Sequence, residues 1–204
     1  MSPTQYAQFG WPVLPVQIRG KTPTLKDWPN KASVDQAEIA RWFANADYNV
    51  GVVTGLRSGI IVLDIDSGSG GKQSLAALTA VYGSLPETVI QNTGGGGKHY
   101  IFKHPGKPVN NRTGLRTGID IRGDGGYIVV APSIHPNGTA YTWQNSPADY
   151  EVAEAPQWLL DMLARDWTPP KSKATSQPRQ HKSNIDWTAP ADEVQAAIYR
   201  EMGI

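Results

Sequence analysis

Residues 59–66, which read GIIVLDID, constrain the fold more than any other stretch of the chain. The run is apolar from Ile60 to Leu63 and rich in β-branched residues, a pattern typical of a strand buried on both faces. Such a strand needs a covering layer on each side. We therefore expect helices and strands in α+β or α/β layers around one sheet.

Other segments alternate between strand and helix patterns. Further strands are expected over 49–54 and 141–143, and as two glycine-linked hairpins, 88–92 with 98–102 and 119–122 with 127–131. A helix is expected to begin at Ser33, where Gln36 completes a capping box, and others over 74–82 and 156–167. Residues 1–30 are rich in proline, and we expect them to be irregular apart from an extended piece at 13–18.

Composition excludes several classes of protein. The 204 residues include no cysteine, which excludes disulfides, a zinc ribbon and a thiol nucleophile. Lys and Arg number 19 against 18 Asp and Glu, and this net charge of +1 excludes a protein that coats nucleic acid by charge alone. No segment has the roughly 20 apolar residues of a membrane helix, and no signal-peptide pattern is visible. We expect a cytoplasmic protein with no membrane partner.

The composition changes at Thr168, which suggests three parts. Residues 1–167 are expected to form the main folded domain. Residues 168–188 are interpreted as a flexible basic linker, because 168–183 hold four positive charges, no negative charge and little to bury. Residues 189–204 are expected to form a short helix, interpreted as the start of a truncated C-terminal module.

Two aspartates stand at the end of the buried strand. Side chains alternate along a strand, so Asp64 and Asp66 are expected on one face and Ile65 on the other. Paired carboxylates repel, and a divalent cation such as Mg²⁺ or Mn²⁺ removes that conflict. The alternative is a pair of aspartates that cap the following turn.

A third carboxylate repeats this geometry. In GIDIRG, residues 118–123, the two isoleucines are expected on one face, with Asp120 and Arg122 on the other. A carboxylate beside a cation and a glycine loop suits a site for metal and phosphate. The alternative is an ordinary Asp–Arg pair on an open face of a sheet.

Glycine is concentrated in the middle of the chain, with 18 of 21 glycines between Gly51 and Gly138. Four of them precede Lys98 and His99 in TGGGGKH, where backbone N–H groups, including those of Gly96 and Gly97, could form an anion-binding nest. The P-loop spacing is absent. The alternative is a hairpin with an exposed histidine.

The surrounding segment is basic. Six Lys or Arg and one acid lie between Lys98 and Arg122, an excess that suits a nucleic-acid backbone or a triphosphate. The other histidines, His104, His135 and His181, have no partner pattern, and we expect them on the surface.

Three motifs in order, VLDIDSGSGGKQSL, TGGGGKHYIF and GIDIRGDGGYIVVAPS, followed by GTAYTW, together resemble the bifunctional primase–polymerase (prim-pol) domain of the archaeo-eukaryotic primase superfamily. The segments WPVLPV, GKTPTLKDW and NVGVVTG match the usual lead-in of that domain. The resemblance covers roughly residues 5–165.

The resemblance implies an α+β fold, an archaeo-eukaryotic primase-like catalytic core with an RNA-recognition-like mixed sheet flanked by helices. It implies a DNA primase and DNA polymerase that transfers nucleotides by a two-metal mechanism in the replication of a phage, plasmid or other mobile element. The partners would be a single-stranded DNA template, nucleoside triphosphates, and a helicase or helical C-terminal module.

Carried over by position, Asp64, Asp66 and Asp120 would be catalytic ligands of two Mg²⁺ or Mn²⁺ ions, and His99 the catalytic histidine that contacts the nucleotide phosphate. Zinc is not expected without cysteine. Charge and geometry add Lys98 and Arg122, and the glycine turn adds Gly96 and Gly97, as nucleotide-binding residues.

Three rival functions remain open at the level of the sequence. The D-x-D pair also serves metal-dependent glycosyltransferases and nucleases, although a glycosyltransferase would not require the second and third motifs. A catalytically idle module that binds DNA or nucleotide is a second alternative, disfavoured because an idle site has no reason to keep mutually repelling acids. A tyrosine-dependent rolling-circle initiator lacks its His-hydrophobe-His pair here.

Overall fold

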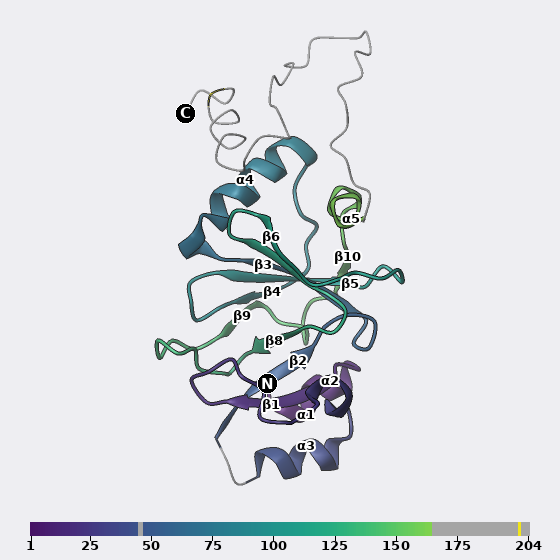
Figure 1. Ribbon diagram of the computed structural model, residues 1–204, viewed down its shortest axis with the longest axis vertical. Helices are drawn as coiled ribbons and strands as arrows, with labels where there is room; N and C mark the ends of the chain where they lie inside the picture. Colours follow the sequence, from purple (N-terminus) through teal and green to yellow (C-terminus); the bar gives the residue numbers. More distant parts are fainter. Residues whose placement is uncertain (45–46, 165–199, 201–204) are drawn as a thin grey trace.

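The structure is a computed structural model that describes residues 1–44, 47–164 and 200 (Figure 1). Its architecture is α+β, as expected, with antiparallel sheets flanked by helices. The strands form two sheets, so the expectation of one sheet is wrong. The proposed linker 168–188 and most of the proposed helix 189–204 lie outside the described residues.

The small sheet has the order β1-β2-β8 and the large sheet the order β6-β7-β3-β5-β4-β9, with β10 pairing parallel to β5. The strands of the small sheet are β1 (Val13–Gln17), β2 (Tyr48–Val53) and β8 (Tyr127–Val130). Those of the large sheet are β3 (Ile60–Ile65), β4 (Val89–Asn92), β5 (Lys98–Lys103), β6 (Arg112–Arg116), β7 (Ile119–Arg122), β9 (Thr142–Asn145) and β10 (Ala153–Glu154).

Helices cover the outer sides of the two sheets (Figure 1). They are α1 (Pro3–Gln8), α2 (Trp28–Lys31), α3 (Gln36–Phe43), α4 (Gly71–Tyr82) and α5 (Gln157–Leu163), together with a 3₁₀ turn, η1 (Ser67–Ser69). No helix in the described part of the chain is both long and apolar enough to cross a membrane.

Strand β3 is buried on both faces, as its sequence predicts. Its residues Ile61, Leu63 and Ile65 belong to a cluster that includes Leu78 of α4 and Leu159 of α5. The alternate residues face the other way.

On that second face, Ile60 and Val62 share a cluster with Val52 and Val130 of the small sheet. Asp64 is the next residue on this inner face of the large sheet. The apolar contact between the two sheets therefore ends where the polar site begins.

Two expectations about local structure are wrong. Helix α3 begins after Asp35, whose carboxylate accepts a hydrogen bond from the Glu38 N–H at 2.7 Å, so Asp35 and not Ser33 is the N-cap. The segment 1–30 also includes the short helix α1, which begins with a proline at its first position.

The second predicted hairpin is also wrong. Strand β7 pairs with β3 and β6, whereas β8 pairs with β2 in the small sheet. The chain leaves one sheet for the other at Gly123, where a Cβ atom would lie 2.1 Å from the Val109 carbonyl oxygen. The first predicted hairpin, β4 with β5, is confirmed.

Candidate active site

Four polar residues form a row across the inner face of the large sheet. In the strand register Asp120 of β7 lies opposite Asp64 of β3, Asp64 opposite His99 of β5, and His99 opposite Gln91 of β4. Side chains of residues directly opposite each other share one face of a sheet. Antiparallel pairing therefore brings together residues that lie up to 56 positions apart in the chain.

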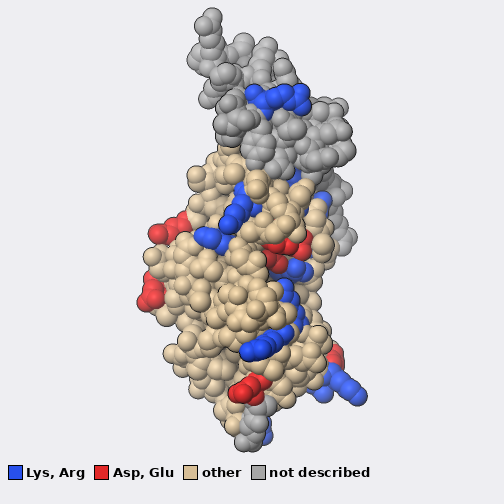
Figure 2. Space-filling view, turned by 90° about the vertical axis from the view of Figure 1, so that its left-hand side faces the viewer, with Lys and Arg blue, Asp and Glu red and all other residues tan. Residues whose placement is uncertain are grey.

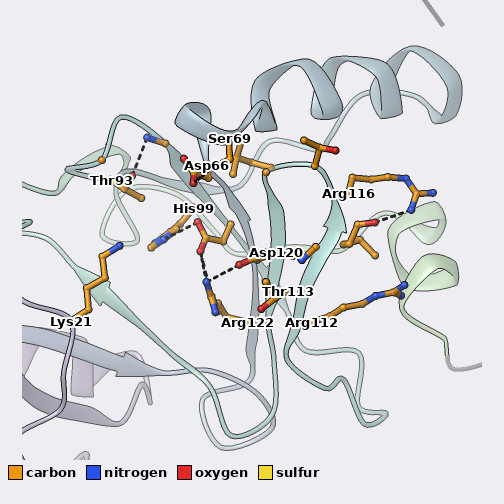
Figure 3. A pocket seen from close by; sticks show the side chains of 18 of the residues that line it. Lys21, Asp66, Ser69, Thr93, His99, Arg112, Thr113, Arg116, Asp120 and Arg122 are labelled. Atoms are coloured by element: carbon orange, nitrogen blue, oxygen red, sulfur yellow. Dashed lines mark hydrogen bonds and ion pairs between the residues drawn. The ribbon is translucent and has the colours of Figure 1, made fainter. Parts of the chain in front are cut away.

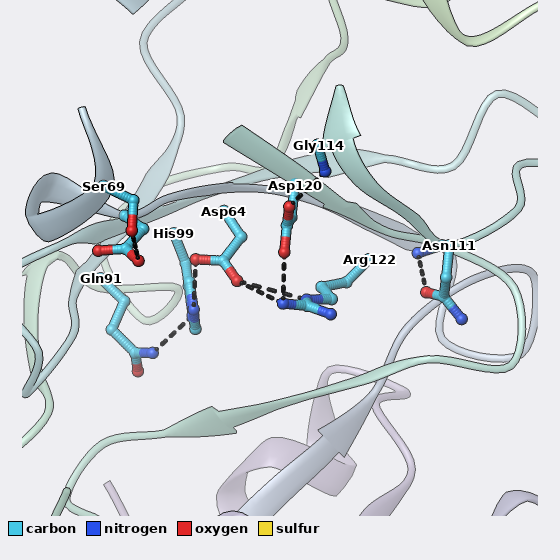
Figure 4. A network of polar contacts seen from close by, with 10 residues as sticks. Asp64, Ser69, Gln91, His99, Asn111, Gly114, Asp120 and Arg122 are labelled. Carbon is cyan, nitrogen blue, oxygen red and sulfur yellow. Dashed lines mark hydrogen bonds and ion pairs between the residues drawn. The ribbon is translucent and has the colours of Figure 1, made fainter. Parts of the chain in front are cut away.

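Arg122 links the two carboxylates of the row (Figure 4). Its Nη2 donates to Asp64 Oδ2 and to Asp120 Oδ2, both at 3.0 Å. Asp120 is held further by the Gly114 N–H, which donates to its Oδ1 at 2.8 Å. The predicted Asp–Arg pair thus exists, and it neutralises part of the repulsion between Asp64 and Asp120.

These contacts change the acidity of Asp64. Burial favours the neutral carboxylic acid, but hydrogen bonds and electrostatic attraction from His99 and Arg122 outweigh it and lower the pKa of Asp64 to about 2. Asp64 is therefore ionised throughout the neutral range and retains its negative charge for a cation.

His99 is buried and lies between Asp64 and Gln91. Its Nε2 is 3.4 Å from Asp64 Oδ1, and its Nδ1 is 3.0 Å from Gln91 Nε2. The expectation that His99 shares a face with Ile101 is confirmed, because both lie on the inner side of β5. The alternative of an exposed histidine is wrong, since His99 is 6% exposed.

Asp66 is turned away from the row. It lies one residue beyond β3, where its Oδ1 accepts from the Gly68 N–H at 2.9 Å and its Oδ2 accepts from Ser69 Oγ at 2.7 Å. Asp66 therefore caps the turn that follows, which is the alternative that the sequence left open. It still lines the same cavity as Asp64 and Asp120. Among the residues that the structure describes, no three His, Asp or Glu are arranged as a ready metal site.

The glycine turn is packed rather than open. The Gly96 N–H donates to the Thr93 carbonyl and the Gly97 N–H to Thr93 Oγ1, both at 3.0 Å, so neither is free to form the predicted nest. A Cβ atom at Gly97 would lie 2.1 Å from the Ile65 carbonyl oxygen. Glycine at this position allows the turn to approach the end of β3 and close that side of the site.

Lys98 is not brought to the site. It follows the alternation of β5 onto the face opposite His99, and its Nζ donates to Gln144 Oε1. Unlike Gly97, neither Lys98 nor Gly96 is among the residues that line the cavity. The structure thus places Lys98 away from the Asp64 cavity, and its role in nucleotide binding stays a prediction.

A cavity of about 950 Å³ opens over Asp120, Asp64 and His99 of the row. Four Lys or Arg and three Asp line it, so its charged side chains leave one excess positive charge. Figure 3 shows Lys21 on one side of the Asp64 row and Arg112 and Arg116 on the other. Figure 2 shows acidic side chains bordered by basic ones on one face of the molecule. Such a cavity has the size and charge pattern to accept a phosphate-bearing ligand.

Several residues at the cavity were not singled out from the sequence. Lys21 comes from the segment after β1, and Arg112 and Arg116 come from β6, within the basic stretch noted above. Tyr141 also lines the cavity, where burial, with smaller electrostatic contributions from Asp64 and Tyr127, raises its pKa to about 12, so its hydroxyl keeps its proton.

Two expected surface histidines are not simple surface residues. His135 lines the cavity. His104 has a side chain only 3% exposed, with Nε2 3.3 Å from Asp124 Oδ1, outside the cavity. His181 lies outside the described residues.

The donor set at the row suits a hard divalent cation. One carboxylate oxygen of Asp64 and one of Asp120 converge on a single positively charged nitrogen, that of Arg122. Oxygen ligands of this kind are those that Mg²⁺ and Mn²⁺ prefer. Asp64 and Asp120 fit such an ion if Arg122 gives way, and Asp66 fits as a further ligand if it leaves its cap.

Comparison with known proteins places the chain in a family. A comparison with curated proteins gave no match. A family model described as bifunctional DNA primase/polymerase, N-terminal, matches residues 3–158, which include both sheets and the whole Asp120–Asp64–His99–Gln91 row. The chain therefore belongs to the bifunctional DNA primase/polymerase family, whose activity is nucleotidyl transfer of the primase and polymerase type.

Proposed function

We propose that the cavity over Asp64 catalyses template-directed nucleotidyl transfer, with nucleoside triphosphates as substrates and single-stranded DNA as template. The observation that carries the proposal is the convergence of Asp64, Asp120 and His99 on one face of the sheet, inside a cavity of about 950 Å³. The chain has no cysteine and so no thiol nucleophile, and this is compatible with nucleotidyl transfer because that reaction needs no protein nucleophile.

In this proposal each side chain has a role that its position supports. Asp64 and Asp120 hold the divalent cations, with Asp66 as a third ligand once its carboxylate leaves the η1 turn. His99 donates a hydrogen bond to a phosphate oxygen, and Arg122, once displaced from between the carboxylates, neutralises phosphate charge.

Charge balance supports a need for added cations. The cavity has one excess positive charge, counted over its Lys, Arg and Asp side chains, which is little for a triphosphate. Two Mg²⁺ or Mn²⁺ ions, when bound, would activate the primer 3′-hydroxyl and stabilise the leaving pyrophosphate. The side chains would then act mainly by positioning the substrate and by electrostatic stabilisation.

The setting is part of the same proposal. Synthesis of DNA from a single-stranded template suits replication of a phage, plasmid or other mobile element, with a helicase or helical C-terminal module as the partner. The modest net charge of +1 predicts weak, salt-sensitive DNA binding by this chain alone.

A second function is favoured by one observation. Arg122 already neutralises part of the repulsion between Asp64 and Asp120, so these acids are stable without a metal and their presence does not argue against an idle module. Such a module would bind nucleotide or DNA without incorporating it. No feature of the cavity favours the glycosyltransferase or nuclease alternative over nucleotidyl transfer.

The deciding experiment measures nucleotide incorporation on single-stranded DNA, with and without a primer, in Mg²⁺ or Mn²⁺. Asp64→Asn removes the central carboxylate, and Asp149→Asn makes the same change at an exposed residue outside the cavity. Metal-dependent product that is lost only in Asp64→Asn is expected. Nucleotide binding without product in the wild type would favour the idle module, and wild-type activity in Asp64→Asn would refute the site.

A further inference from the structure

Gln91 is a fully buried amide whose orientation is fixed by the backbone. Its Oε1 accepts a hydrogen bond from the Ala131 N–H at 2.8 Å, and its Nε2 donates one to the Val129 carbonyl at 2.9 Å. A carbonyl cannot donate and a backbone N–H cannot accept, so only one orientation of the amide satisfies both contacts.

The second N–H of Gln91 Nε2 faces the His99 ring. Nδ1 of His99 is 3.0 Å away, and a donor at this distance needs a lone pair opposite it. Nδ1 therefore carries no proton, and in a neutral imidazole the proton is then on Nε2.

The other side of the ring agrees with this tautomer. His99 Nε2 is 3.4 Å from Asp64 Oδ1. A proton on Nε2 points toward that carboxylate, whereas a lone pair there would face negative charge. The two neighbours of the ring thus favour the same arrangement from opposite sides (Figure 4).

We propose that Gln91 is a positioning residue, which holds His99 with its proton on Nε2 and so presents an N–H donor to the cavity. The backbone at Val129 and Ala131 fixes Gln91, and Gln91 in turn fixes His99. The catalytic meaning of this relay rests on the proposed function, because the donor would contact a phosphate oxygen of the bound nucleotide.

The tautomer can be measured without any activity assay. Long-range proton–nitrogen NMR correlations distinguish the two tautomers, and the chain has four histidines, so His99 can be assigned by its loss in His99→Gln. We expect Nε2–H in the wild type. A wild-type ring protonated at Nδ1 would overturn the proposal.

Variants of Gln91 test whether it sets the tautomer. Gln91→Glu places an acceptor opposite Nδ1 of His99, and we expect the ring proton to move to Nδ1. Gln91→Met removes the polar contact, and we expect a mixture of the two tautomers. Asn49→Asp is the matched control, because Asn49 is also a buried amide that contacts backbone, at Gly20 and Ile134, and no contact joins it to His99. If the folded Gln91→Met protein holds His99 in the Nε2–H tautomer as completely as the wild type does, the proposal is overturned.

A binding assay separates positioning from stability. Loss of one hydrogen bond to phosphate is worth about tenfold in affinity, so nucleotide binding is expected to weaken by about tenfold in Gln91→Glu and Gln91→Met. Asn49→Asp, compared at matched loss of thermal stability, is expected to bind nucleotide as the wild type does. Unchanged binding in a Gln91 variant whose tautomer has moved would overturn the positioning role. A wild type that shows Nε2–H and yet incorporates no nucleotide would refute the proposed function and leave the relay standing.

Discussion

The protein contains two pairs of aspartate and histidine with nearly the same geometry, and they are built for different purposes. His99 Nε2 is 3.4 Å from Asp64 Oδ1, and His104 Nε2 is 3.3 Å from Asp124 Oδ1. Both aspartates have a lowered pKa despite the opposing effect of burial. The pairs differ in what else holds the carboxylate.

Backbone donors hold Asp124. The Leu56 N–H donates to its Oδ1 and the Val109 N–H to its Oδ2, both at 2.8 Å, so the carboxylate joins two loops to the turn after β7. Such donors cannot leave without moving the chain, and this pair is structural.

Side chains hold Asp64. His99 and Arg122 contact it through their side chains, and no backbone N–H group of the described residues donates to its carboxylate. Asp64 also lines the cavity, whereas Asp124 does not. The comparison suggests that the nature of the donors, more than the Asp–His distance, separates a structural pair from a functional one.

The largest expected effect is on catalysis at Asp64. Asp64→Asn is expected to lower nucleotide incorporation by about a thousandfold or more, because a cation ligand is worth several kcal/mol in the transition state. Asp124→Asn should retain wild-type activity per folded molecule. Equal losses of activity in the two variants, measured on folded protein by primer extension, would abolish the distinction between the pairs.

The reverse ranking is expected for stability. Asp124→Asn replaces one of the two carboxylate oxygens with an NH₂ donor and so leaves one of the two loop N–H groups without an acceptor, and we expect it to lower the free energy of unfolding by about 2 kcal/mol. Denaturation in urea measures this loss. At neutral pH, Asp64→Asn should lower the free energy of unfolding by less than Asp124→Asn does, because Arg122 keeps Asp120 as its partner. A larger loss of stability in Asp64→Asn would show that Asp64 is mainly structural.

Acid should reveal the Asp64 network directly. The pKa of Asp64 is lowered from 3.8 to about 2, so its contribution is present above pH 4 and is lost as the pH falls through 2. Urea unfolding in metal-free buffer should show a smaller loss of stability between pH 4 and 2 in Asp64→Asn than in the wild type, and parallel curves would contradict the lowered pKa.

The smallest effect is expected at Lys98. Because its side chain lies on the face away from the cavity, Lys98→Gln should change the KM for nucleotide by less than about twofold. Arg112→Gln removes a charge from the cavity wall and should raise that KM by roughly three- to tenfold. The opposite ranking in steady-state kinetics would restore Lys98 to the site.

Much of the site was predictable from local patterns. Strand periodicity predicts that Asp64 and Ile65 point to opposite faces of the sheet, and the burial pattern of β3 confirms it. In β7 the same alternation separates the polar Asp120 and Arg122 from the buried isoleucines. The turn-capping role of Asp66 was an open alternative, and the distance to Gly68 and Ser69 decides for it.

The rest depends on long-range contacts that one sequence does not encode locally. The register that sets Asp64 between His99 and Asp120 arises from pairing of strands that are not neighbours in the chain. Gln91 has no motif, because its role comes from contacts to Val129 of β8 and to Ala131 just beyond that strand. The exchange of β8 into the small sheet was missed for the same reason, since its pairing with β2 joins residues 74 to 80 positions apart in the chain.

The most direct test of the account offers the wild-type protein one nucleotide at a time on a primed single-stranded template of known next base, with Mg²⁺ or Mn²⁺. We predict incorporation of the complementary nucleotide alone, abolished in Asp64→Asn and retained in Asp124→Asn. Incorporation that ignores the template base, or that survives in Asp64→Asn, would contradict a template-directed polymerase site built on the Asp64 row.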